Sequence, residues 1–129
     1  AIPDLKAQNH HFRVDPLDPS RVWFTTKPSG THTGMLAGAI KPTGKVIDGT
    51  YQTCSVKFNE EGKVVQFTIG YPMDRRTGNT GGLGGVFGIF YAVGSPLPFP
   101  EAQPWKQSKR YKFFNFIGQL TAKLKKDNK

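Results

Sequence analysis

The chain has 129 residues, with 18 Lys and Arg against nine Asp and Glu, for a net charge of +9, and it has a single cysteine. This length suits one domain that buries a core without covalent cross-links, and the lone Cys54 excludes an internal disulfide and a cysteine-rich zinc cluster. The positive charge either serves solubility alone or favours an anionic partner: nucleic acid, an acidic protein or an anionic membrane surface.

The first residues carry neither the basic nor the apolar region of a signal peptide, and the chain does not begin with Met. We therefore expect a processed or partial form, and the single cysteine is compatible with a reducing or organellar interior, such as that of a chloroplast. The longest uncharged stretch, residues 78–100, has an apolar part at residues 83–93 that is too short to span a bilayer. We expect a buried helix or a docking segment there.

The first half of the chain has the patterns of antiparallel strands. Residues 5–14 and 21–33 are separated by DPLDPS, whose prolines and aspartates are typical of turns, and the second run is rich in β-branched and aromatic residues. In residues 51–74, two runs with a period of two flank NEEG, where Gly62 supplies the positive φ of a hairpin turn. On one face of each strand we expect, respectively, Gln52, Cys54, Val56 and Phe58, and Val65, Phe67, Ile69 and Tyr71.

The last third of the chain changes to helical spacing, which predicts an amphipathic helix over residues 108–125 with Ser108 as its cap. We expect its apolar face to lie on the sheet, and the rival interpretation is docking to a partner or a membrane surface. An antiparallel sheet with such helices is an α+β fold. The basic residues that would serve docking are Lys109, Arg110, Lys112, Lys123, Lys125 and Lys126.

Few residues form a pattern typical of catalysis. GNTGGLGG lacks the lysine of a phosphate-binding loop and the three histidines lack metal-binding spacing, so we expect neither a metal nor a cofactor. Asp74 follows an apolar strand, so its carboxylate could face a cavity, where a raised pKa would suit a general base. The alternative is that Asp74 pairs with Arg75 or Arg76. The aromatics of KRYKFF fit the apolar side of the helix rather than a stacking platform, which disfavours nucleic-acid binding.

Short motifs follow one another between residues 2 and 74. They are PDL at 3–5, GTHTG at 30–34, PTGK at 42–45, EGKV at 61–64, and Asp74. In this order they resemble the SnoaL-like polyketide cyclase family of the nuclear transport factor two-like superfamily. The resemblance covers rather more than half of the chain, and the Gly-rich and Pro-rich residues from 75 to 105 read as an extension of the family's C-terminal end.

The resemblance implies a strongly curved antiparallel or mixed sheet over residues 1–105. This sheet would form a cone-shaped half-barrel around a cavity for an apolar small molecule, with the basic helix at residues 106–129. It implies no cofactor, and it makes Asp74 the candidate base, with His32 at the pocket rim. The alternative for His32 is a structural role at the end of a strand. The implied ligand pocket is lined by Trp23, Cys54, Val56, Phe58, Phe67, Ile69 and Tyr71.

The family's helices before Pro-Asp-Leu have no counterpart here, so we expect that they were removed or that a partner closes the cavity. This favours a binding or scaffold subunit of a larger assembly. The alternatives are a cofactor-free isomerase or cyclase using Asp74, and a basic docking module for an acidic protein or a membrane-associated complex. The sequence thus favours protein partners or an apolar small molecule, leaves peripheral membrane association and a homodimer open, and disfavours nucleic acid.

Overall fold

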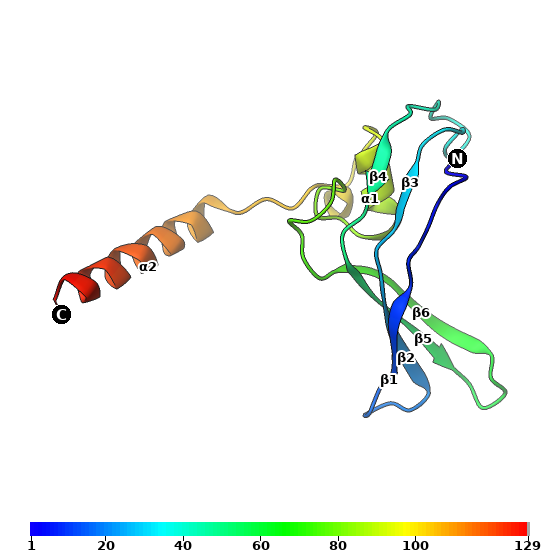
Figure 1. Ribbon diagram of the computed structural model, residues 1–129, viewed down its shortest axis with the longest axis horizontal. Coiled ribbons are helices and arrows are strands. Elements are labelled where there is room, and N and C mark those ends of the chain that lie inside the picture. Colours follow the sequence, from blue (N-terminus) through cyan, green and yellow to red (C-terminus); the bar gives the residue numbers. More distant parts are fainter. Residues whose placement is uncertain (129) are drawn as a thin grey trace.

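Two antiparallel sheets and two α-helices make up the computed structural model, which describes residues 1–128 and confirms the α+β class (Figure 1). The larger sheet has the strand order β1-β2-β5-β6, and the smaller sheet pairs β3 with β4. Within the described residues neither sheet closes into a barrel. The strands are β1 (His10–Val14), β2 (Arg21–Thr26), β3 (Ser29–Thr31), β4 (Val46–Asp48), β5 (Gln52–Phe58) and β6 (Val64–Pro72).

Polar side chains hold the two hairpin turns of the larger sheet. In the first turn, Asp15 Oδ1 accepts hydrogen bonds from the backbone N–H groups of Leu17 (2.8 Å) and Asp18 (3.2 Å). In the second, Asn59 Oδ1 accepts from the N–H groups of residues 61 and 63, and Gly62 has a φ of 76°. These contacts are the side-chain turn motifs that Asp and Asn favour. The hairpin predicted in residues 51–74 is confirmed, and β1 and β2 form a second hairpin.

The strand predicted at residues 21–33 is divided in the structure. β2 ends at Thr26, just before Pro28, and the chain then forms β3, which pairs with β4 in the smaller sheet. Pro28 has no N–H to donate to a ladder and disfavours a continuous strand. The chain therefore passes from the larger sheet to the smaller one at this proline.

Helix α1 (Gly85–Ala92) lies beside β4 of the smaller sheet and also meets β6, and the short 3₁₀ helix η1 (Pro100–Ala102) packs against α1. The buried apolar residues of this region, Ile47, Val93 and Ala102, come from β4, the end of α1 and η1. Among the described residues only two further apolar side chains are buried, Phe24 and Cys54 in the larger sheet. The core is therefore small and divided between the two sheets.

Helix α2 (Lys109–Asp127) stands at the end of an extended connector, away from the rest of the molecule (Figure 1). The predicted helix is confirmed, and its N-terminus is capped as expected, because Ser108 Oγ accepts from the N–H of Tyr111 at 3.0 Å. Within residues 1–128, however, α2 contacts no other helix or strand and all of its residues are exposed. The expectation that its apolar face lies on the sheet is wrong. Lys129 lies outside the described residues.

Two glycines join β6 to α1. Gly70 has a φ of 79°, a conformation that favours glycine, and a Cβ on Gly84 would overlap the carbonyl group of Gly70. The N–H of Gly85 then donates to Gln52 Oε1 at 3.0 Å, which ties the start of α1 to β5. The close approach of the two backbones at this joint therefore depends on glycine at both positions.

We expect Gly84→Ala to lower the free energy of unfolding by about 1–3 kcal/mol, because the added methyl group must displace the backbone of β6. Urea denaturation followed by fluorescence measures the change. Gly118→Ala is the matched control, since nothing lies within 4 Å of a Cβ at that position in α2. An unchanged denaturation midpoint for Gly84→Ala would show that the two segments are not in this close contact.

Candidate functional site: an apolar sheet face

The strand register sorts the side chains of the larger sheet by polarity, because residues directly opposite each other in an antiparallel pair lie on the same face. Val14 pairs with Val22, Val22 with Val56, Val56 with Phe67, and Phe24 with Cys54. The ring of Phe12 stacks on Phe24 with a centroid distance of 5.3 Å. We call this surface the apolar sheet face: Phe12, Val14, Val22, Phe24, Cys54, Val56, Phe58, Val64, Phe67 and Ile69.

The opposite face of the same sheet is polar and internally bonded. Arg21 donates to Ser55 Oγ at 2.8 Å and to Gln66 Oε1 at 3.0 Å, and its guanidinium carbon lies 5.6 Å from the centroid of the Trp23 ring. Lys57 on this face pairs with Asp18 at 3.3 Å. Charges and hydroxyl groups therefore partner one another here, and the apolar side chains are concentrated on the other side.

Large side chains of the apolar sheet face remain in contact with solvent. Phe12, Val14, Val64, Phe67 and Ile69 keep between 54% and 63% of their surface exposed, whereas Phe24 and Cys54 at the centre are buried. No element among residues 1–128 covers the rest of this face. Contiguous exposed apolar patches on proteins mark interaction surfaces, so this face is the candidate functional site.

The structure divides the seven residues of the predicted ligand pocket between the two faces. Cys54, Val56, Phe58, Phe67 and Ile69 belong to the apolar sheet face, while Trp23, opposite Ser55, belongs to the polar face and donates its indole N–H to Asp15 Oδ2 at 2.8 Å.

Tyr71 also lies on the polar face, because Gly70 is an extra residue in β6. Ser55 pairs with Thr68 but Thr53 pairs with Tyr71, so β6 has one more residue than β5 over this interval. Such a bulge, with glycine at positive φ, shifts the following residue to the other side. The expectation that Tyr71 shares a face with Phe67 and Ile69 is therefore wrong.

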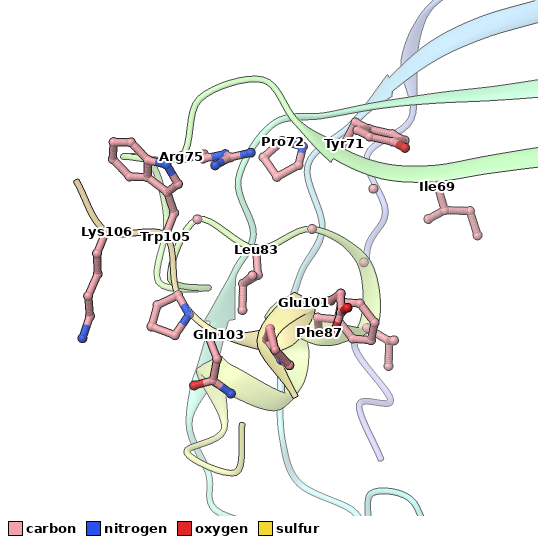
Figure 2. A pocket seen from close by; sticks show the side chains of 17 residues that line it. Ile69, Tyr71, Pro72, Arg75, Leu83, Phe87, Glu101, Gln103, Trp105 and Lys106 are labelled. Carbon is pink, nitrogen blue, oxygen red and sulfur yellow. The ribbon is translucent and has the colours of Figure 1, made fainter. Parts of the chain in front are cut away.

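A cavity of about 820 Å³ adjoins one end of the apolar sheet face. It lies between the end of β6, the start of α1 and residues 100–106, and Ile69 belongs to both surfaces. In Figure 2, Ile69 and Tyr71 stand at one end of the cavity and Arg75 and Trp105 at the other, with Leu83 between them. The Arg75 guanidinium carbon lies 5.8 Å from the centroid of the Trp105 ring. The lining is mainly apolar and also includes the charged residues Arg75, Lys106 and Glu101.

Asp74 forms a local ion pair. Its Oδ1 accepts from the backbone N–H and the Nε–H of Arg76, both at 3.0 Å, and its Oδ2 accepts from Nη2 at 3.2 Å. The hydrogen bonds from the Arg76 side chain, and then that from its backbone, hold the pKa of Asp74 below its ordinary value of 3.8. A general base in an apolar pocket would have the opposite shift. The pairing with Arg76, raised as the alternative, is the arrangement that the structure has.

His32 is fully buried and closes the end of the smaller sheet. Its backbone N–H donates to the Lys45 carbonyl, and its Nδ1 accepts from the N–H of Thr43 at 3.2 Å and lies 2.9 Å from Thr43 Oγ1. These contacts support the structural role of His32 at the end of a strand. No hydrogen bond of the described residues links His32 to Asp74, so the two predicted catalytic residues do not form one site.

The described part of the chain contains no group of three His, Cys, Asp or Glu side chains that could hold a metal ion. It also contains no helix that is both long enough and apolar enough to cross a membrane. The six basic residues predicted to bind a partner all lie on α2, apart from the sheet and the cavity.

Comparisons with family models, with curated proteins and with solved structures find no match to this chain. The resemblance to SnoaL-like cyclases therefore rests on the motifs in the sequence.

Sequence reasoning missed the cavity and five members of the apolar sheet face: Phe12, Val14, Val22, Phe24 and Val64. Val14 and Val22 lie on the two sides of the DPLDPS turn and pair across it. Their positions in the sequence could therefore have indicated that they share a face. The cavity has no such signal, because residues 69–72, 82–87 and 100–106 come together only in the fold.

We expect the Asp74 carboxyl group to titrate with a midpoint below 3.8 in carboxyl-carbon NMR spectra. Because the folded pKa is lowered, the ion pair adds stability above pH 3.8, and this contribution is lost as the pH falls through the folded pKa. Arg76→Gln should raise the midpoint toward 3.8, and Arg75→Gln, which removes a cation that does not bond Asp74, should leave it in place. A midpoint above 3.8 in the unsubstituted chain would restore Asp74 as a candidate base.

Proposed function

We propose that the chain is a non-catalytic binding and scaffold module of a larger assembly. Its apolar sheet face would receive amphipathic helices of a partner protein. The observation that carries this proposal is the concentration of ten apolar side chains on one face of the larger sheet, five of which keep more than half of their surface exposed. In α+β proteins, helices are the elements that cover one face of an antiparallel sheet.

Burial of this face alone gives too little free energy for stable binding, so the partner should also contact the surface next to it. Full burial of a Val, Ile or Phe side chain stabilises by about 1.5–3 kcal/mol, so covering five half-exposed side chains contributes roughly 5 kcal/mol. The loss of translational and rotational freedom on association costs about as much or more. The adjoining cavity at Ile69, Leu83 and Phe87 adds apolar contact area to the same site.

The SnoaL-like resemblance agrees with this function. In that family, helices close a cone over a strongly curved sheet, and we propose that the partner supplies such helices to a curved half-barrel built on β1, β2, β5 and β6. The partner would then complete a cavity that this chain lines with Cys54, Val56, Phe58, Phe67 and Ile69.

An apolar small molecule is a second candidate ligand, favoured by the cavity of about 820 Å³ and its apolar walls. Arg75, near one end of that cavity, would suit an anionic group on such a ligand. Acid-base catalysis has no comparable support, because the Asp74 carboxylate is held ionised by Arg76 and is separate from His32.

Binding of the uncharged dye Nile red tests the proposed site. We expect the full chain to raise and blue-shift the dye's fluorescence, and the double variant Phe67→Ser, Ile69→Ser to reduce the effect several-fold, because both side chains are exposed members of the apolar sheet face. Gln66→Ser, Thr68→Ser is the matched control from the polar face of the same strand.

The variant Leu83→Arg separates the two candidate ligands, because it places a charge in the cavity and leaves the sheet intact. Loss of dye binding in Leu83→Arg alone would favour a small molecule in the cavity over a partner helix on the sheet. Equal dye binding in all variants would contradict both sites. Sedimentation equilibrium of the same variants shows whether a second copy of the chain covers the face.

A further inference from the structure

The positive charge of the chain is concentrated at one end. Residues 106–129 contain eight of the 18 Lys and Arg but only one of the nine Asp and Glu, so this segment has a net charge of +7. The preceding 105 residues contain the remaining ten Lys and Arg and eight Asp and Glu, a net charge of +2. The attraction to anionic partners therefore belongs to the end of the chain that holds α2.

Helix α2 is amphipathic, with an apolar stripe that runs along the helix axis. At 100° per residue, five large side chains fall on one stripe, which we call the α2 stripe: Phe113, Phe116, Ile117, Leu120 and Leu124. Lys112 and Lys123 border one edge of the stripe, and Arg110 borders the other. Between 43% and 65% of the surface of each stripe residue is exposed.

The charge pattern indicates which surface α2 meets. Cations lie at both ends of the helix, in residues 109–112 and 123–126, and its single acid, Asp127, is at the C-terminal end. A surface that complements α2 has an apolar layer that can receive the stripe and, directly above it, anionic groups that can pair with the cations. Anionic lipid does so, because headgroup phosphates and carboxylates lie directly above acyl chains. An acidic protein would match the charge but would also need an apolar groove as long as the stripe.

We propose that α2 is a peripheral membrane anchor that lies in the interface of an anionic bilayer, with the α2 stripe toward the acyl chains. Four Lys and Arg side chains that lie on or beside the stripe contact anionic headgroups: Lys109, Arg110, Lys112 and Lys123. The extended connector between η1 and Ser108 holds the two sheets away from the bilayer (Figure 1).

This anchor is independent of the proposed scaffold function, because α2 and the apolar sheet face share no contacts in the described chain. It would place the scaffold at a membrane surface. Because most of the stability of helices in proteins comes from the packing of an apolar face, binding should also increase the helicity of α2.

Co-sedimentation of the full chain with vesicles tests the anchor. We expect binding to phosphatidylcholine–phosphatidylserine vesicles, weak binding to pure phosphatidylcholine, a steep decrease with added salt, and a gain of helical circular dichroism on binding. The double variant Phe116→Ser, Leu120→Ser should weaken binding by roughly ten-fold or more, because it removes the centre of the α2 stripe. Asn115→Ser, Gln119→Ser is the matched control from the opposite side of the helix.

Three results would overturn the anchor. The first is an absence of binding to phosphatidylserine vesicles. The second is salt-sensitive binding that both double variants retain equally, which would indicate adsorption by charge and an acidic protein as the partner. The third is a stable dimer in solution that Phe116→Ser, Leu120→Ser converts to a monomer, which would show that a second copy covers the stripe.

Discussion

Apart from their bulges, the strands of the larger sheet send successive side chains to opposite faces. The pairing of β1, β2, β5 and β6 places most of the apolar side chains on one face. Water is a poor solvent for such a surface. The buried apolar core of the described chain is small, at Phe24, Ile47, Cys54, Val93 and Ala102. The exposed apolar sheet face is the basis for proposing that the chain is part of an assembly.

The local elements could be predicted because their signals lie close together in the sequence. The alternation in residues 51–74 and the turn at Asn59 and Gly62 specify the β5–β6 hairpin without reference to the rest of the chain. Helical spacing and the cap at Ser108 likewise specify α2. Five of the seven predicted pocket residues share a face for the same reason, because the alternation of side chains along a strand can be read from that strand's sequence alone.

Features that depend on distant contacts could not be predicted in this way. Gly70 is part of a regular alternation in the sequence, and only its pairing with β5 shows that it is an extra residue that moves Tyr71 to the polar face. The sequence of α2 specifies the helix but not its position, which depends on the extended connector between η1 and Ser108. The sequence leaves Asp74 either facing a cavity or paired with an arginine, and only the fold shows the contact with Arg76 that lowers its pKa.

Solvent relaxation of methyl signals tests the apolar sheet face most directly. In NMR spectra of the full chain with a soluble gadolinium chelate, the account predicts strong relaxation of the methyl groups of Val14, Val64 and Ile69. Ile47, which is fully buried, should be protected in the same sample. If the methyl groups of Ile69 and Val64 were as protected as those of Ile47, the face would already be covered, and the account would be contradicted.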